Sequence, residues 1–160
     1  MTPYVVDTNV VIVANGGETT HADLACQLSC IEKLESVVEE NTIAIDSEHL
    51  ILDEYQRNLS ASGQPGAGDK FFKHVLNFQY RDANVVTVPV TRSNDERRGF
   101  AELPRNTLDP SDRKFLAVAV VAKAIVLNAT DSDWDEQKPL MDTLGVKVEQ
   151  LCPPYARRPS

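Results

Sequence analysis

The chain has 160 residues, of which 42% are hydrophobic and 25% charged, and its formal net charge at pH 7 is −8. This length and composition are typical of one soluble globular domain whose core needs no covalent staple. No apolar run is long enough to cross a bilayer, and the N-terminus lacks the form of a signal peptide. The acidic balance is the opposite of a basic nucleic-acid footprint, so either the protein avoids polyanions or its acids gather around cations.

Apolar periodicity and capping residues predict the elements along the chain. A buried strand at residues 4–6 leads into a short helix that stops at Asn15-Gly16-Gly17. The further expected elements are an amphipathic helix at 22–40, a strand at 42–46, a helix from the N-cap Ser47 to about residue 59, a flexible loop at 60–68, a helix at 69–80, a strand at 84–90, a polar segment at 91–107 with a short helix around 95–103, a buried helix from the N-cap Asp109 to 123, and strands at 124–128 and 147–151. We therefore expect one domain over residues 1–152, followed by a loose Pro-rich tail at 153–160.

Four acids occupy corresponding places in this pattern. Asp7 and Asp131 follow buried strands, Asp112 opens a buried helix, and Glu54 lies beside the apolar stripe of the helix after Ser47. If the strands are parallel, their carboxyl ends and the helix N-termini share one edge of the sheet, where the four carboxylates could converge. Each acid also has a plain structural explanation, as a turn residue, a favourable first-turn charge or the water-facing edge of a stripe.

Carboxylates gathered in one cleft repel one another, and the usual remedy is a hard divalent cation. Ligation by carboxylates and water, rather than by His or Cys, favours Mg²⁺ or Mn²⁺. One or two such ions activate a water and stabilise the leaving oxygen of a phosphodiester. The pattern of acids therefore predicts metal-dependent phosphate chemistry that needs no protein nucleophile.

The three cysteines, Cys26, Cys30 and Cys152, form an odd set without a pairing framework, which favours a reducing, cytoplasmic setting. Cys26 and Cys30 lie four residues apart on a predicted helix, with His21 nearby, so a zinc site is conceivable. The better interpretation is that both are small buried hydrophobic residues.

The order of the motifs resembles that of PIN-domain nucleases, over nearly the whole chain from Tyr4 to about Leu151. The matching stretches are Val-Val-Asp-Thr-Asn-Val-Val from residue 5, Leu-Asp-Glu-Tyr from residue 52, Asp-Pro-Ser-Asp-Arg-Lys-Phe-Leu-Ala-Val-Ala from residue 109 and Asn-Ala-Thr-Asp-Ser-Asp-Trp from residue 128. The resemblance implies a three-layer, Rossmann-like α/β fold with a central parallel sheet of four or five strands flanked by helices.

The resemblance also implies an activity and its site. The expected activity is hydrolysis of single-stranded RNA by a metal-dependent endoribonuclease, and many small members of the family are toxins of toxin–antitoxin pairs. An antitoxin-like protein partner and a homo-oligomer are therefore expected, and membrane association is not. The implied catalytic and metal-binding acids are Asp7, Glu54, Asp112 and Asp131, with Asp133 as a further metal ligand. The candidate substrate-binding residues are Thr8, Asn9, Arg97, Arg98, Arg113 and Lys114, although each basic residue is also explained as a solvated surface charge.

Two other interpretations stay open. A haloacid-dehalogenase-like phosphatase also begins with a strand and an Asp, but it requires a second Asp two residues later, where this chain has Asn9. A non-catalytic PIN-like module would use the acidic cleft to bind a basic partner. The intact set of four acids argues against such a module.

Overall fold

The computed structural model describes residues 2–17 and 22–159. Its strands are β1 (Pro3–Val6), β2 (Thr42–Asp46), β3 (Val85–Val88), β4 (Ile125–Asn128) and β5 (Val148–Gln150). Its helices are α1 (Thr8–Ala14), α2 (Leu24–Glu40), α3 (Leu50–Asn58), α4 (Ala67–Phe78), α5 (Arg113–Ala122), α6 (Asp133–Glu136), α7 (Lys138–Leu144) and a 3-10 turn, η1 (Pro154–Ala156). No helix in these ranges is long and apolar enough to span a membrane.

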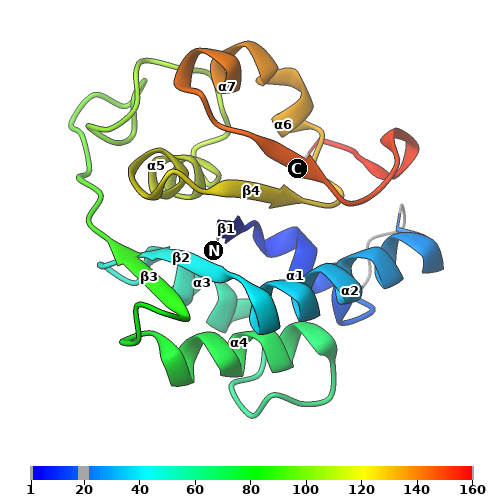
Figure 1. Ribbon diagram of the computed structural model, residues 1–160. Helices are drawn as coiled ribbons and strands as arrows, with labels where there is room; N and C mark the ends of the chain where they lie inside the picture. Colours follow the sequence, from blue (N-terminus) through cyan, green and yellow to red (C-terminus); the bar gives the residue numbers. More distant parts are fainter. Residues whose placement is uncertain (1, 18–21, 160) are drawn as a thin grey trace.

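The five strands are all parallel and lie in the order β3-β2-β1-β4-β5. β1 is central, because Tyr4 pairs with Ile43 of β2 on one side and with Ile125 of β4 on the other. Helices α1, α2 and α4 contact one another on one face of the sheet, and α5 packs against β1 to β4 on the other face (Figure 1). The predicted three-layer α/β fold with a parallel sheet is therefore confirmed.

The middle layer is buried because its strands offer almost no polar side chains. Val5 and Val6 of β1 have no exposed surface, and Ile43 and Ile45 of β2 have almost none. Helix α5 is apolar on nearly every side, and its residues 115–119 are almost completely buried against the sheet. Burial of each large apolar side chain contributes about 1.5–3 kcal/mol. The carboxyl edge of the sheet is thus a rigid support for the residues that follow each strand.

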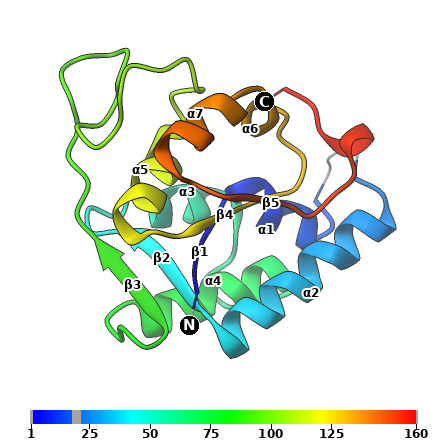
Figure 2. The same cartoon turned by 45° about the horizontal axis from the view of Figure 1, so that its top comes forward.

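The crossover connections leave β1 and β4 in opposite directions. From β1 the chain passes through α1 and α2 to β2, whereas from β4 it passes through α6 and α7 to β5. Figure 2 shows β1 between β2 and β4, with α5 nearby. In open parallel sheets, ligands bind in the crevice that opens at such a switch point. Asp7 follows β1 and Asp131 lies in the loop after β4, so both acids lie at this crevice.

The segment between β3 and α5 differs from the prediction. Residues 89–112 contain turns and an isolated antiparallel bridge between Arg92 and Phe100, and no helix around 95–103. The Arg98 side chain donates to the carbonyl oxygen of Leu103 at 2.7 Å, and Arg113 donates to that of Glu96 at 2.6 Å. These arginines satisfy backbone carbonyls that a helix would have satisfied internally.

Helix α3 begins at Leu50, so the prediction of Ser47 as its N-cap is wrong. The buried Asp46 at the end of β2 performs the capping instead. Its carboxylate accepts hydrogen bonds from the backbone N–H groups of Glu48, Leu50 and Ile51 at 2.9 to 3.1 Å. A side chain from before the turn thus satisfies the free N–H groups of the first helical turn.

The end of the chain is packed, so the prediction of a loose tail is wrong for the described residues up to 159. Arg158 donates its backbone N–H to the carbonyl of Thr130 at 2.8 Å, and its own carbonyl accepts from Ser132 at 3.0 Å. Arg157 forms an ion pair with Asp135 at 2.6 Å. The tail therefore lies against the loop that holds Asp131.

The helices α6 and α7 were also not expected.

The cysteines also differ in part from the prediction. Cys26 of α2 and Cys152, which follows β5, form a disulfide across 126 positions of the sequence. Cys30 is a buried free thiol, as expected for a small hydrophobic residue. The prediction failed for the pair because the two partners are far apart in the sequence and meet only when the tail packs against α2. His21, the further zinc ligand considered, lies outside the described residues.

Candidate metal centre

Three of the predicted acids meet at the carboxyl edge of the sheet. One carboxylate oxygen from each of Asp7, Asp112 and Asp131 lies within 4.8 Å of the other two. All three side chains are buried, with 4 to 6% of their surface exposed. We refer to these three residues as the aspartate cluster. They come from the end of β1, the start of α5 and the loop after β4, as the positions of the acids in the sequence predicted.

The role of Asp112 is not that of a helix cap. Asp112 lies at the N-cap position of α5, but its side chain makes no capping hydrogen bond. Asp109, the predicted N-cap, instead closes a turn by accepting from the backbone N–H and the hydroxyl of Ser111. Asp112 lies close enough to Asp7 and Asp131 for their charges to raise its pKa, and its Oδ2 is buried without a partner in the described part of the chain. The carboxylate therefore faces the cluster.

Burial and mutual repulsion shift the titration of the cluster. The pKa of Asp112 rises to about 9, first because burial disfavours its charged form and then because of the charges of Asp7 and Asp131. The pKa of Asp7 rises to about 7, chiefly through burial and against the lowering effect of a hydrogen bond from Trp134. Burial also raises the pKa of Asp131. Two full charges about 4 Å apart repel by about 4 kcal/mol at an effective dielectric constant of 20.

The arrangement suits a hard divalent cation. Mg²⁺ binds oxygen at about 2.1 Å, so oxygens on opposite sides of the ion lie about 4.2 Å apart. The oxygens of the aspartate cluster, within 4.8 Å of one another, need little movement to reach this spacing. The Oδ2 of Asp112 is a buried acceptor without a partner among the described residues, and a bound cation would satisfy it. The donor set of three carboxylates therefore fits the predicted Mg²⁺ or Mn²⁺.

Glu54 lies beside the aspartate cluster and has other partners. Its Oε1 accepts from the ammonium group of Lys114 at 2.8 Å, and its Oε2 accepts from the hydroxyl of Thr8. Its charge still contributes to the raised pKa of Asp7, so it is near the cluster. Thr8 and Lys114, which we predicted to bind substrate, both hold Glu54. Direct ligation of a metal by Glu54 stays a prediction.

Trp134 contacts the aspartate cluster and was not among the predicted site residues. Its indole N–H donates to Oδ2 of Asp7 at 2.7 Å, and the ring is 1% exposed. A buried indole N–H needs a hydrogen-bond acceptor. Trp134 lies in an acid-rich motif, so the sequence could have indicated that a carboxylate is that acceptor. The bond fixes one oxygen of Asp7, as partners outside the ligand shell orient metal ligands.

Two asparagines shape the loop that holds Asp131. The fully buried Asn128 donates to the carbonyl oxygen of Asp131 and to the side chain of Gln150, both at 2.7 Å. Asn9 donates to Oδ1 of Asn128 at 3.0 Å, and its own Oδ1 accepts from the backbone N–H groups of residues 129 and 130. We predicted that Asn9 binds substrate, but its amide is engaged in holding this loop in place.

Asp133 lies next to the aspartate cluster and is not one of its three members. Asp133 begins α6, and its backbone N–H donates to Oδ1 of Asp131 at 2.8 Å. The group of described residues that meets the spacing of a metal site contains Asp131 and not Asp133. A charge on Asp133 raises the pKa of Asp131, so the two carboxylates are close. Direct ligation by Asp133 stays a prediction.

The predicted RNA-binding arginines lie in different environments. Arg113 is buried, and its guanidinium donates to carbonyl or amide oxygens of Glu96 and Asn106. Arg98 likewise donates to the carbonyls of Ala101 and Leu103. Both side chains brace the 91–107 segment. Arg97 is exposed on that segment.

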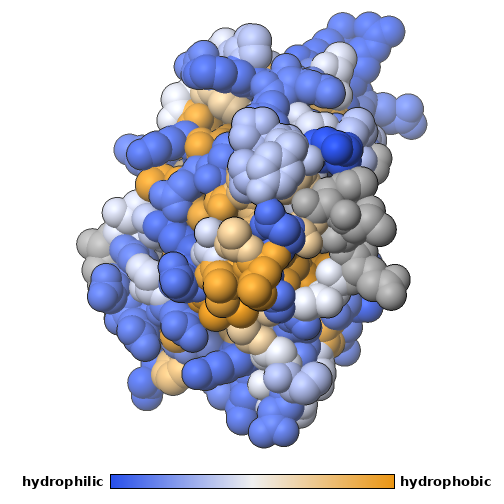
Figure 3. Space-filling view, turned by 90° about the vertical axis from the view of Figure 1, so that its right-hand side faces the viewer, coloured by the Kyte–Doolittle hydropathy of each residue, from blue (hydrophilic) through white to orange (hydrophobic). Residues whose placement is uncertain are grey.

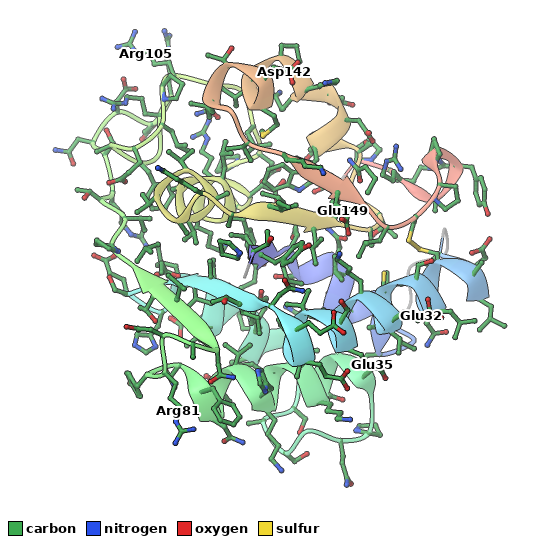
Figure 4. The ribbon with its side chains drawn as sticks, viewed as in Figure 1. Glu32, Glu35, Arg81, Arg105, Asp142 and Glu149 are labelled. Atoms are coloured by element: carbon green, nitrogen blue, oxygen red, sulfur yellow. A yellow bond between two sulfur atoms is a disulfide. The ribbon has the colours of Figure 1, made fainter. Side chains whose placement is uncertain are left out.

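Two further surface features lie away from the aspartate cluster. Figure 4 shows Glu32 and Glu35 on α2, which contribute to the acidic charge of the protein at a distance from the switch point. Figure 3 shows apolar side chains gathered on one face of the molecule. Leu24 and Leu28 of α2 are exposed over 69% and 48% of their surface. Large exposed apolar residues of this kind occur where proteins meet partners.

The sequence matches no protein-family model and no curated protein. Among solved structures, the chain is similar to one in the crystal structure of VapBC2 from Rickettsia felis bound to a DNA fragment from their promoter. The similarity covers 93% of this chain and 98% of that one, with 19% sequence identity and a TM-score of 0.47. A likeness at this level gives no argument about function. A functional assignment therefore depends on the order of the motifs and on the geometry of the aspartate cluster.

Proposed function

We propose that this protein is a PIN-domain nuclease, a divalent-metal-dependent endoribonuclease that hydrolyses phosphodiester bonds in single-stranded RNA. The observation that supports this proposal most strongly is the buried aspartate cluster, in which Oδ2 of Asp112 has no partner among the described residues. The position of the cluster at the switch point of a parallel sheet and the order of the four sequence motifs add to this support.

In this proposal, Asp7, Asp112 and Asp131 hold Mg²⁺ or Mn²⁺. The cation would activate a water and stabilise the leaving oxygen of the phosphodiester. Trp134 orients Asp7 through its indole N–H, and Asn128 fixes the backbone of Asp131. These contacts set the ligand oxygens in place before a substrate arrives.

Glu54 and Lys114 complete the proposed site. Their ion pair is largely buried, with 17% and 13% of the two side chains exposed. A buried carboxylate beside the aspartate cluster would add to its repulsion, and the ammonium group of Lys114 offsets that charge. The same ammonium group is placed to attract a phosphate that approaches the cluster.

The two alternatives receive less support. A haloacid-dehalogenase-like phosphatase requires a second acid at the position of Asn9, whose side chain is occupied with the backbone of residues 129 and 130. A non-catalytic module would not require three buried carboxylates at metal-binding distance. The exposed Leu24 and Leu28 support a protein partner, for which we propose an antitoxin-like protein. A homo-oligomer and a cytoplasmic location remain part of the same proposal, and the location now depends on the family resemblance, because the Cys26–Cys152 disulfide removes the argument from unpaired cysteines.

RNA cleavage by the purified protein tests the proposal. We expect single-stranded RNA to be cut with Mg²⁺ or Mn²⁺ and not with chelator. Asp7→Asn should abolish cleavage and keep the fold, whereas the control Asp82→Asn should cleave normally. Asp82 is an exposed acid before β3, at the opposite edge of the sheet.

Three results would contradict the proposal. Undiminished cleavage by Asp7→Asn would indicate a contaminating nuclease or a wrong site. Release of phosphate from small phosphomonoesters without RNA cleavage would favour the phosphatase. Binding of Mn²⁺ without cleavage of any RNA would favour the non-catalytic module.

A further inference from the structure

A cleft beside the aspartate cluster gathers positive charge in this otherwise acidic protein. It encloses about 450 Å³ between α3, the 91–107 segment and the start of α5. Figures 1 and 2 show this segment as a long loop that leads from β3 to α5. Four basic residues line the cleft, namely Arg57, Arg92, Arg113 and Lys114, and the acid in its lining is Asp53. We refer to this hollow as the basic cleft.

Most of this positive charge is not neutralised within the described chain. Arg57 and Arg92 are exposed and have no ion-pair partner among residues 2–17 and 22–159. Arg113 donates only to neutral carbonyl and amide oxygens, so its charge also remains. Lys114 is the member that pairs with a carboxylate, that of Glu54. The cleft therefore attracts anions.

One part of the remaining lining is apolar, which narrows the chemistry of the ligand. Leu50, Phe100 and Pro110 contribute hydrocarbon surface to the cleft. A site with an apolar wall and cations at its rim suits a nucleotide, whose base lies against the wall while its phosphates meet the cations. The volume lies in the range of small-ligand sites, about 300–1,000 Å³.

Residues next to Asp112 in the sequence connect the basic cleft with the aspartate cluster. Lys114 lines the cleft and contacts Glu54, whose charge acts on Asp7. Asp112 of the cluster lies in the sequence between Pro110 and Lys114, both of which line the cleft. A strand with one phosphate at the cluster would therefore pass Lys114 and enter the cleft.

A second hollow, of about 530 Å³, lies between α7 and β5 and does not share this character. Its lysines are matched by acids in its lining, and Lys138 is paired with Asp142. This hollow has no excess of positive charge to offer a polyanion.

We propose that the basic cleft binds the nucleotide next to the scissile phosphate of single-stranded RNA, with Arg57 and Arg92 as phosphate-binding residues. This inference rests on the proposed function and adds to it a substrate subsite formed by residues outside the aspartate cluster. Arg57 and Arg92 occur outside the four sequence motifs. The tertiary structure alone brings them into one cleft with Lys114.

Binding of a short, fluorescently labelled single-stranded RNA tests the subsite without catalysis. Anisotropy would be measured with Asp7→Asn as the parent protein, in chelator, over a series of salt concentrations. Each phosphate contact to a single strand contributes about 0.7 to the slope of log affinity against log salt. Adding Arg57→Ala or Arg92→Ala to the parent should lower that slope by about 0.7, and the two together should lower it by about 1.4.

Arg81→Ala is the matched control. Arg81 is an exposed arginine whose guanidinium lies 5.7 Å from the Phe78 ring. Figure 4 shows Arg81 at the opposite end of the molecule from Arg105, which belongs to the 91–107 segment. This control should keep the slope of the parent. A thermal unfolding curve for each variant separates lost binding from lost folding.

Several outcomes would overturn the inference. Equal slopes for Arg57→Ala, Arg92→Ala and Arg81→Ala would remove the cleft from the RNA path, as would absence of RNA binding by the parent. Binding of polyglutamate in place of RNA, dependent on Arg57 and Arg92, would assign the cleft to an acidic protein partner. The two proposals fail separately: metal-dependent cleavage with unchanged slopes would overturn only the subsite, and arginine-dependent binding without cleavage would overturn only the nuclease activity.

Discussion

Replacing Asp112 with asparagine should stabilise the metal-free protein. The pKa of Asp112 is about 9 in the folded state, against an ordinary value of 3.8, mainly because the carboxyl group is buried. The unfolded chain therefore releases this proton at lower pH than the folded protein, and stability falls as pH rises above 3.8. Below that pH both states hold the proton and the penalty vanishes.

The size of the effect follows from the same pKa. Each pH unit between the unfolded and folded values costs about 1.4 kcal/mol, so the penalty at pH 7 is on the order of 4 kcal/mol. Asparagine fills nearly the same volume and has no proton to release, so Asp112→Asn should recover much of this energy. If Asp112 were only a favourable charge at a helix start, the substitution would instead cost about 0.3–1 kcal/mol. The two explanations thus differ in sign.

Thermal unfolding in chelator at pH 5 and pH 7 measures the difference. For a domain of this size, 1 kcal/mol corresponds to about 2–4 °C, so Asp112→Asn should unfold roughly 5–15 °C higher than wild type at pH 7. The gain should shrink at pH 5, where the linkage penalty is smaller. Asp82→Asn removes an exposed charge at the other edge of the sheet and should leave the curve almost unchanged.

Added Mn²⁺ should raise the unfolding temperature of wild type more than that of Asp112→Asn. Ligand at about 100 times its dissociation constant contributes roughly 2.7 kcal/mol to the stability of wild type. Asp112→Asn should lose most of this gain because one charged ligand is missing. Equal or lower metal-free stability of Asp112→Asn at pH 7, together with an undiminished response to Mn²⁺, would refute the placement of Asp112 in the aspartate cluster.

Three further predictions concern residues around the cluster. Trp134 is the single tryptophan of the chain and contacts Asp7, so Mn²⁺ binding should quench the intrinsic fluorescence. Trp134→Phe should weaken Mn²⁺ binding in calorimetric titrations by about 10- to 100-fold. Unchanged affinity would show that Trp134 does not orient Asp7. Cys152→Ser should lower the free energy of unfolding, measured in urea, by about 2–4 kcal/mol, because the disulfide to Cys26 closes a long loop. Equal stability of wild type with and without reductant would contradict this expectation. Arg113→Ala should lower the free energy of unfolding by roughly 2–3 kcal/mol, because it removes charged donors from buried acceptors. The control Arg97→Ala should change it by no more than about 0.5 kcal/mol. Similar urea midpoints for both variants would show that Arg113 does not brace the 91–107 segment.

The sequence by itself determined the layers of the fold and the places of the acids. Apolar runs such as Tyr4-Val5-Val6 form buried parallel strands because they offer no polar face to water. Asp7 must then lie at the end of its strand, where an ionised carboxylate can find a partner. Asp112 and Asp131 are restricted in the same way by a buried helix and a buried strand. Local pattern is therefore sufficient to predict which edge of the sheet holds the site.

Local pattern failed where distant side chains satisfy the backbone. The segment around residues 95–103 looks helical, yet Arg98 and Arg113 bind its carbonyls and keep it irregular. The start of α3 shifted because Asp46 reaches past Ser47 to cap it. In each case a specific hydrogen bond outweighs a helix preference of a few tenths of a kcal/mol per residue.

Only the tertiary structure decided which residues meet. The sequence offered four or five acids as equivalent ligands, but packing brings Asp7, Asp112 and Asp131 together and leaves Glu54 paired with Lys114. It also turns predicted substrate residues such as Arg113 inward and brings Arg57 into one cleft with Lys114. Some of these contacts join residues far apart in the sequence, such as Glu54 and Lys114 at 60 positions, and periodicity has no information about such partners. The sequence gives the chemical type of each side chain. Which side chains come into contact depends on how the crossover connections pack the helices against the sheet.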